Sequence, residues 1–259
     1  MSTVKTDIAD SSDHHADTGK AKRIGVGLLL ILFVGLASMS LVTAQRTERQ
    51  RAQVGLAGGK CTFEQRVPNW LRTVAGDEFH SFLDYPVIVA VAMAGEKITD
   101  ANLAKLPEMP ELRSLDLDNA QVTSEGMKLV SQWKNIHRIN LTNTQVTDIT
   151  PLAELPHLES LKLNFSPVRK EHLTGLSQLK SLTDLGAGYI RVTDEDVIEI
   201  VKCPQLVDLS IAASDLGEHG LQPLTALQEL KTLVLVKAKY DSADLEAFKA
   251  ARPDVGIGL

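Results

Sequence analysis

A repeated spacing of apolar residues constrains this chain more than any other feature of its sequence. A leucine or isoleucine recurs seven times, at intervals of 24, 24, 22, 24, 24 and 24 residues. These residues, which define position 1 of each unit, are Ile88, Leu112, Ile136, Leu158, Leu182, Leu206 and Leu230. Positions 4, 6 and 11 are also apolar or aromatic, and Ala187 is the one small residue among them. Such a period predicts a solenoid in which neighbouring units share one core.

Each unit contains the pattern of one short strand and one helical segment. Alternation at positions 4 and 6 predicts a strand with both side chains in the core. A polar pair after position 11 is suited to accept hydrogen bonds at a helix start. The pairs are Thr99-Asp100, Thr123-Ser124, Thr147-Asp148 and Thr193-Asp194. Arg169-Lys170 and Gly217-Glu218 break this pattern, and Pro151 predicts a shortened, 3₁₀-like helix in the 22-residue unit.

The repeats resemble a known class of bacterial proteins. The segments "LDLDNAQVTSEG" and "INLTNTQVTDITPLAEL" are similar to bacterial leucine-rich repeats. The 24-residue units resemble the ribonuclease-inhibitor-like and cysteine-containing subclasses, and the shorter unit resembles internalin repeats. The resemblance implies an α/β fold, a leucine-rich-repeat solenoid of about seven repeats with a parallel sheet on its concave face. It implies little about activity, because function depends on the site that a fold presents.

The sequence departs from this class at position 9 of the unit. Many leucine-rich repeats have Asn or Cys there, whereas this column has no Asn. We therefore expect Thr144, Ser166, Ser214 or water to satisfy the backbone groups of these turns. Ile190 in this column predicts a distorted turn.

An uncharged apolar segment at residues 24–44 precedes the repeats. As a helix its 21 residues span about 32 Å, the thickness of a hydrocarbon core. We predict an uncleaved transmembrane anchor; the alternative is a signal peptide cleaved near Ala44, which leaves a secreted soluble binder. Three Lys or Arg residues flank each end, so the charge rule gives a tie. We place the N-terminus inside and the repeats outside the cytoplasm, as expected of a single N-terminal anchor.

The other domain boundaries follow from composition and pattern. Residues 1–23 are rich in polar residues and predict a disordered tail. Residues 45–67 are interpreted as a juxtamembrane linker. With the segments beside it, this stretch is similar to the region joining membrane helix and repeats in bacterial membrane-anchored repeat proteins. Residues 68–87 contain aromatic and apolar residues and predict a helical N-terminal cap. The repeat domain, residues 88–259, ends in a helix and a strand-like tail.

Composition argues against several functional classes. The net charge of −6 and the pI of about 5.7 disfavour nucleic acid as a partner. The two cysteines, Cys61 and Cys203, are far apart and lack metal-ligand spacing, so we expect neither a zinc site nor a disulfide framework. Cys203 falls at an apolar position of its unit and is expected to be a buried packing residue. No phosphate-binding loop is present, and we expect no cofactor and no metal.

Two aromatic residues stand out on the surface of the predicted solenoid. Phe165 and Tyr189 both occupy position 8, in consecutive units, which predicts rings about one strand spacing apart. Aromatic and arginine side chains dominate binding hot spots. The alternative is that the two rings only shield the adjacent loop. The other predicted contact residues lie on the outward positions of the middle units: Arg138, His137, Asp116, Asn140 and Lys162.

These patterns predict a non-enzymatic, membrane-anchored module that binds a protein partner through its concave face. The competing class is an enzyme or an enzyme subunit, in which Ser114, Asp116 and His137 approach each other. A flat sheet offers neither the strained turn nor the oxyanion hole that a serine nucleophile needs. A calcium site at Asp116, Asp118 and Asn140 is the other alternative, against a solvated polar face.

Overall fold

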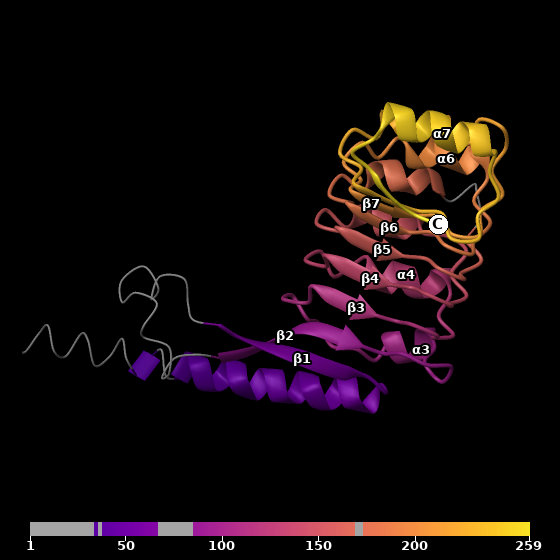
Figure 1. Cartoon of the computed structure of the whole chain (residues 1–259). Helices are drawn as coiled ribbons and strands as arrows, with labels where there is room; N and C mark the ends of the chain where they lie inside the picture. Colours follow the sequence, from indigo (N-terminus) through magenta and orange to yellow (C-terminus); the bar gives the residue numbers. More distant parts are fainter. Residues whose placement is uncertain (1–33, 36–37, 67–84, 169–172) are drawn as a thin grey trace, which may run out of the picture. The chain divides into compact units, whose positions relative to one another are not determined.

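The computed structural model describes residues 34–35, 38–66, 85–168 and 173–259 (Figure 1). The chain divides into two compact units. One comprises Met1–Arg46 and Gln65–Pro86, and the other comprises Thr47–Glu64 and Val87–Leu259. Among the described residues, no helix has both the length and the apolar character that a membrane crossing requires. The predicted tail, most of the predicted membrane segment and residues 68–84 of the predicted cap lie outside the described residues.

The repeats form a continuous sheet in which each strand adds beside its predecessor in the sequence. Strands β2 to β9 pair in parallel, and position 4 of one unit always faces position 4 of the next, as Leu115 faces Ile139. This register holds across the 22-residue unit, where Ile139 faces Leu161. The strands are β1 Lys60–Arg66, β2 Tyr85–Ala92, β3 Ser114–Asp116, β4 Arg138–Asn140, β5 Ser160–Lys162, β6 Asp184–Gly186, β7 Asp208–Ser210, β8 Thr232–Val234 and β9 Gly256–Gly258.

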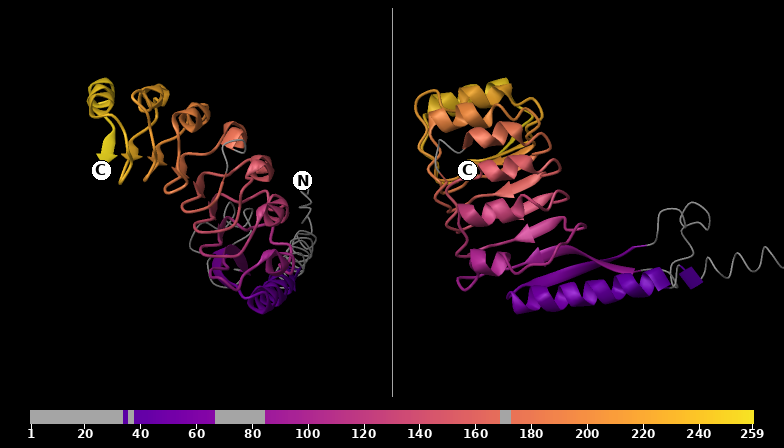
Figure 2. Two further views of the ribbon diagram at one scale, coloured as in Figure 1. Left: turned by 90° about the vertical axis from the view of Figure 1, so that its right-hand side faces the viewer. Right: turned by 180° about the vertical axis from the view of Figure 1, so that it is seen from behind.

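Short helices return the chain from one strand to the next. Within Val87–Leu259 the strands line the inner, concave side and the helices line the outer side (Figure 2). The helices are α3 Asp100–Leu103, α4 Ser124–Val130, η1 Thr150–Glu154, η2 Thr174–Gln178, α6 Asp194–Ile200, η3 Gln222–Ala226 and α7 Ser242–Ala251. The 3₁₀ helix predicted at Pro151 is confirmed as η1. Two 24-residue units also use 3₁₀ helices, η2 and η3, where we expected the ordinary helical segment; a proline in the first turn of η3 accompanies this difference.

The core follows the repeat. Leu112, Leu115 and Leu117, at positions 1, 4 and 6, expose 1% of their surface or less, and the other units repeat this burial. The prediction for Cys203 is confirmed, because its side chain is buried in the same core. Burial raises the pKa of the Cys203 thiol to about 11, which keeps it protonated and unreactive at neutral pH.

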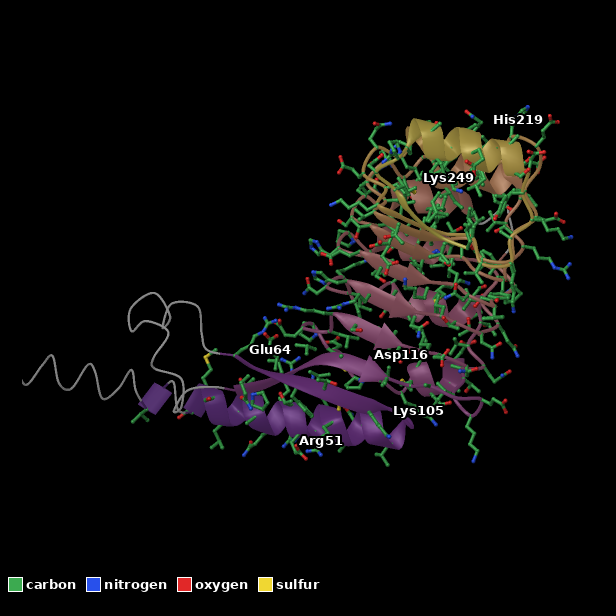
Figure 3. The ribbon with its side chains drawn as sticks, in the orientation of Figure 1. Arg51, Glu64, Lys105, Asp116, His219 and Lys249 are labelled. Carbon is green, nitrogen blue, oxygen red and sulfur yellow. The ribbon has the colours of Figure 1, made fainter. Side chains whose placement is uncertain are left out.

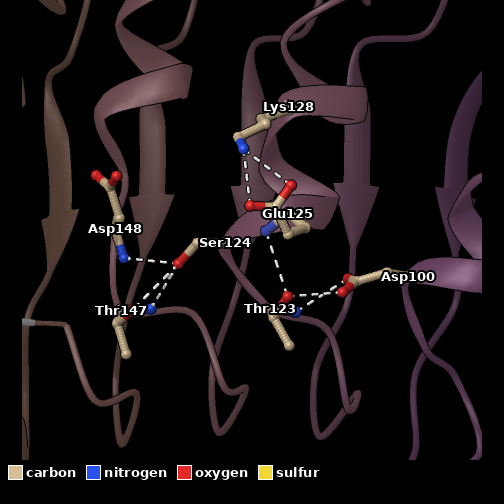
Figure 4. Close-up of polar contacts among 7 residues, drawn as sticks. All are labelled: Asp100, Thr123, Ser124, Glu125, Lys128, Thr147 and Asp148. Atoms are coloured by element: carbon tan, nitrogen blue, oxygen red, sulfur yellow. Dashed lines mark hydrogen bonds and ion pairs between the residues drawn. The ribbon is translucent and has the colours of Figure 1, made fainter.

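Polar side chains join successive helix starts (Figure 4). Both Asp100 carboxylate oxygens accept hydrogen bonds from Thr123, one from its amide at 3.0 Å and one from its hydroxyl at 2.6 Å. Thr123 in turn caps α4 by accepting from the Glu125 amide. The capping predicted at the polar pairs is therefore confirmed for Thr99, Thr123 and Thr193. The second residue of a pair links to the next unit, as Asp100 does to Thr123 and Ser124 does to Thr147.

The N-terminal end of the core differs from expectation. Residues 38–56 are helical and β1 follows them, so the stretch interpreted as a juxtamembrane linker, residues 45–67, contains a helical part and a strand. Val54 and Ala57 are fully buried against the first repeat, and Asn102 Nδ2 donates to the Ala57 carbonyl at 3.0 Å. Cys61 and Phe63 of β1 also pack partly buried against this core, although most of the stretch around these apolar residues is polar. Residues 85–87, expected to end a helical cap, instead begin β2.

The C-terminal end closes as predicted, with a helix, α7, followed by a strand, β9. Phe248 of α7 is fully buried. The guanidinium of Arg252 donates to the carbonyls of Leu227, Gln228 and Leu230, which face the end of the solenoid. Asp254 pairs with Arg252 at 2.9 Å, and this hydrogen bond holds the pKa of the Asp254 carboxyl below its usual range.

Candidate functional site

Position 8 of every unit has a left-handed backbone. In the first six units the position-8 amide continues the ladder into the next unit, as when the Tyr189 amide donates to the Ala212 carbonyl at 2.7 Å. In the turns of Ala120, Ser166 and Ala238, the position-9 amide donates back to the position-6 carbonyl. Position 8 is then the third residue of a β-turn with positive φ. The position-8 residues are Gly95, Asn119, Asn143, Phe165, Tyr189, Ala213 and Lys237, with φ between 52° and 106°.

The choice of residues in this column changes along the solenoid. Gly and Asn tolerate a left-handed backbone, and they occupy the first three turns. Phe165 and Tyr189 adopt it at a cost of about 1–2 kcal/mol each, which glycine at the same place would avoid. Strained residues cluster at functional sites, so the bulky side chains here require an explanation beyond the turn.

The two rings form a stacked pair. The ring centroids of Phe165 and Tyr189 lie 4.2 Å apart with an interplanar angle of 13°. Phe165 remains 54% exposed, whereas Tyr189 is half-buried. The predicted side-by-side arrangement is therefore confirmed. A ring that leaves more than half of its surface in water does little shielding, which disfavours the loop-packing alternative.

A distorted turn follows Tyr189, as the sequence predicted at Ile190. Arg191 also has a left-handed backbone, with φ of 59°, so this turn has two such residues. Ile190 between them packs partly against the core. The half-buried isoleucine thus replaces the small polar residues that close other turns, where Thr144 and Ser166 donate to the Leu141 carbonyl.

A hollow of about 470 Å³ lies beside the rings, and the sequence analysis missed it. It is lined by residues of three consecutive turns: Arg191, Thr193, Ala213, Ser214, Asp215, Lys237 and Lys239. The Lys237 ammonium lies 5.8 Å from the centroid of the Tyr189 ring, so the hollow and the rings form one continuous surface. The sequence sign available was the presence of cations at positions 8 and 10: Arg191 and Lys239 at position 10, and Lys237 at position 8.

The other predicted contact residues lie on the strands. Asp116 on β3 (Figure 3) accepts from Asn140 Nδ2 at 2.9 Å. Lys162 pairs with Asp184 at 2.5 Å across β5 and β6. Each pair joins neighbouring strands on the open face of the sheet.

Arg138 lies farther from the rings than the sequence suggested. It is exposed and faces Ser160, which precedes Phe165 by five residues on the neighbouring unit. At about 3.3 Å per residue this places Arg138 roughly 16 Å from the ring pair along the strand direction. A partner that contacts both has to extend across the face of the sheet.

The arrangement on β3 and β4 does not assemble a nucleophile with a base. His137 Nδ1 lies 2.7 Å from the Asn135 carbonyl, and its ring stacks on that of His157, 5.8 Å away. Asp116 Oδ1 is engaged by Asn140 and by the Asp118 amide. The Asn140 oxygen accepts from the Thr142 amide at 3.0 Å. These bonds engage Asp116 Oδ1 and the Asn140 oxygen, and within the described ranges no group of three His, Cys, Asp or Glu residues is placed to hold a metal.

Solved structures of bacterial proteins share this architecture. Internalin C2 of Listeria monocytogenes superposes with a TM-score of 0.52 at 20% identity, covering 73% of this chain and 80% of that chain. The chain has a leucine-rich-repeat fold. The internalin InlF of the same organism superposes with a TM-score of 0.51 at 19% identity, over 73% of this chain. The match spans about half of InlF, 53%. No protein-family model and no curated protein sequence matches the chain.

Proposed function

We propose that this leucine-rich-repeat chain is a non-enzymatic protein-interaction module whose binding surface centres on the stacked rings of Phe165 and Tyr189. One observation supports this most: two large aromatic side chains occupy left-handed turn positions, and Phe165 is 54% exposed while Tyr189 is only half-buried. Aromatic anchors of this kind dominate protein interfaces. The side chains on the strands, Arg138 among them, then provide polar contacts along the concave face.

The hydrogen bonding of the strand residues favours binding over catalysis. Polar groups on β3 to β6 pair with each other across the strands, as in Asp116 with Asn140 and Lys162 with Asp184. Such pairs leave a firm polar surface around an apolar centre, which is the usual anatomy of a protein interface.

The aromatic pair offers a direct test. We expect Phe165→Ala and Tyr189→Ala each to weaken partner binding by about 2 kcal/mol or more. We expect the free energy of unfolding to change by about 1 kcal/mol or less, because the lost stacking and the relieved backbone strain offset each other. Chemical crosslinking on native membranes, followed by mass spectrometry and a titration with the identified partner, measures the binding.

Ile198 provides the matched control. It is an apolar residue with 48% exposure, but it lies on α6, on the outer side of the solenoid. Ile198→Ala should leave the same partner bound. If the ring variants melt far below the parent, the rings are loop packing; if they melt normally and still bind, the surface lies elsewhere. Either outcome contradicts the proposal.

We further propose that residues 24–44 anchor the chain in a membrane, with the repeats outside the cytoplasm. The support is the uncharged run of 21 residues, together with the helical backbone at residues 38–46 across the alternative cleavage point at Ala44. N-terminal sequencing of the mature chain separates an anchor from a cleaved signal. A C-terminal reporter that is active only in the cytoplasm should stay silent, and its activity would reverse the orientation.

A further inference from the structure

The hollow beside the aromatic pair is cationic in a chain that is acidic overall. Arg191, Lys237 and Lys239 line it together with one carboxylate, Asp215. The whole chain has a net charge of −6. The sign of the local charge is therefore opposite to that of the molecule, which is the pattern expected where an oppositely charged partner binds.

These cations are available for a partner. In the part of the chain that the structure describes, Arg191 makes no ion pair, and Lys237 contacts only the Tyr189 ring. Lys239 lies 3.8 Å from Asp215, but both side chains are at least 70% exposed, so water competes for this pair. The guanidinium of Arg191 thus keeps its full set of donors for a carboxylate.

The hydroxyl groups that line the hollow already donate hydrogen bonds within the protein. The Ser214 hydroxyl donates to the Ile211 carbonyl, and the Thr193 hydroxyl donates to Asp196 at 2.9 Å. Recognition in the hollow therefore depends on charge, and its volume of about 470 Å³ is enough for one or two side chains.

We propose that this hollow binds carboxylate side chains of an acidic segment in the protein partner. The proposal rests on the proposed function, because the same segment places an apolar residue against Phe165 or Tyr189. Lys237 joins the two contacts, since it lines the hollow and lies over the Tyr189 ring. Arg191 forms paired hydrogen bonds with one carboxylate, a geometry that the planar guanidinium favours. An extended nucleic acid is disfavoured, because three cations give too little charge neutralisation for a polyanion.

A short labelled peptide tests this inference on the full chain. The probe has one tryptophan followed by four glutamates, and its matched control has four glutamines instead. Fluorescence anisotropy should show the glutamate peptide binding at least about ten-fold tighter, with the preference falling as salt rises. The double variant Arg191→Gln with Lys237→Gln should remove about ten-fold of this affinity.

Two exposed lysines outside the hollow supply the control variant. Lys231 precedes β8, and Lys105 follows α3 (Figure 3). Their double change to Gln alters the net charge by the same amount and should change affinity by about two-fold or less. If this control weakens the glutamate peptide as much as the hollow variant does, or if the peptide shows no preference for glutamate, the inference is overturned.

Two further outcomes separate this inference from the function on which it rests. In the first, the glutamate peptide binds no more tightly than the glutamine peptide while Phe165→Ala still abolishes capture of the native partner. That result supports the interaction module and contradicts the binding of an acidic segment. If partner capture is indifferent to the rings, the proposed function itself fails. An oligodeoxythymidine that binds more tightly than the glutamate peptide would assign the hollow to nucleic acid and overturn the inference.

Discussion

At the scale of single residues, the left-handed turn at position 8 shows where the chain loses stability to present a particular side chain at the surface. The fold asks only for positive φ at position 8, and glycine or asparagine meets that need at Gly95, Asn119 and Asn143. Farther along, the chain places Phe165 and Lys237 in the same conformation. Both side chains are exposed and lie outside the core, which indicates a role at the surface.

Lys237→Asn should therefore stabilise the protein. Asparagine adopts the left-handed backbone more readily than lysine, and the exposed ammonium has only a distant contact with Tyr189. We expect a gain of about 0.5–1 kcal/mol in the free energy of unfolding, measured by urea denaturation. Lys231→Asn, at an exposed position without positive φ, is the control and should not stabilise. Equal effects at both sites would show that charge, and not the turn, is responsible.

At the scale of the elements, each short helix depends on its predecessor. Helices of seven residues or fewer are marginal alone, and α3 and α4 are of this kind. Asp100 at the start of α3 holds Thr123, which caps α4, so a side chain of one unit fixes the helix start of the next (Figure 4). The polar pairs therefore work between units as well as within them.

Asp100→Ala should cost more stability than an exposed charge on the same helices. It leaves the half-buried Thr123 amide without its partner, and hydrogen bonds to charged groups contribute about 1.5–3 kcal/mol. The exposed Glu125–Lys128 pair on α4 is the comparison, and Glu125→Ala should cost about 0.5 kcal/mol or less. Thermal and urea unfolding of both variants checks the order. A cost for Asp100→Ala as small as that for Glu125→Ala would mean that the units are not coupled through this side chain.

At the scale of the whole molecule, the repeat core needs cover at both ends. Residues 47–64 cover the first unit through Val54 and Ala57, while α7 and β9 cover the last. A solenoid unit contacts only its neighbours, so an uncovered end exposes the apolar face of one whole unit.

Two fragments test this arrangement. Residues 47–259 should unfold cooperatively, because both covers and all repeats are present. Residues 65–259 lack Val54 and Ala57 and should melt at lower temperature or aggregate, since Met93 and Ile98 of the first unit lose their cover. Circular dichroism during heating measures both. Identical melting of the two fragments would show that residues 47–64 do not protect the core.

The sequence by itself determined the repeat and everything that depends on its period. A fixed period places equivalent residues side by side, so register determines the strand positions, the buried columns, the 3₁₀ helix at Pro151 and the pairing of Phe165 with Tyr189.

The tertiary structure alone decided three features. Residues 47–64 became a cover because burial is set by what a segment packs against, and two small apolar residues give no periodic pattern. The left-handed turn is shown only by the φ angles, because phenylalanine and tyrosine at positions 165 and 189 are not residue types that predict a positive φ. The cationic hollow arose because Arg191 and Lys237, 46 residues apart in the sequence, lie on turns that the solenoid brings within one pocket.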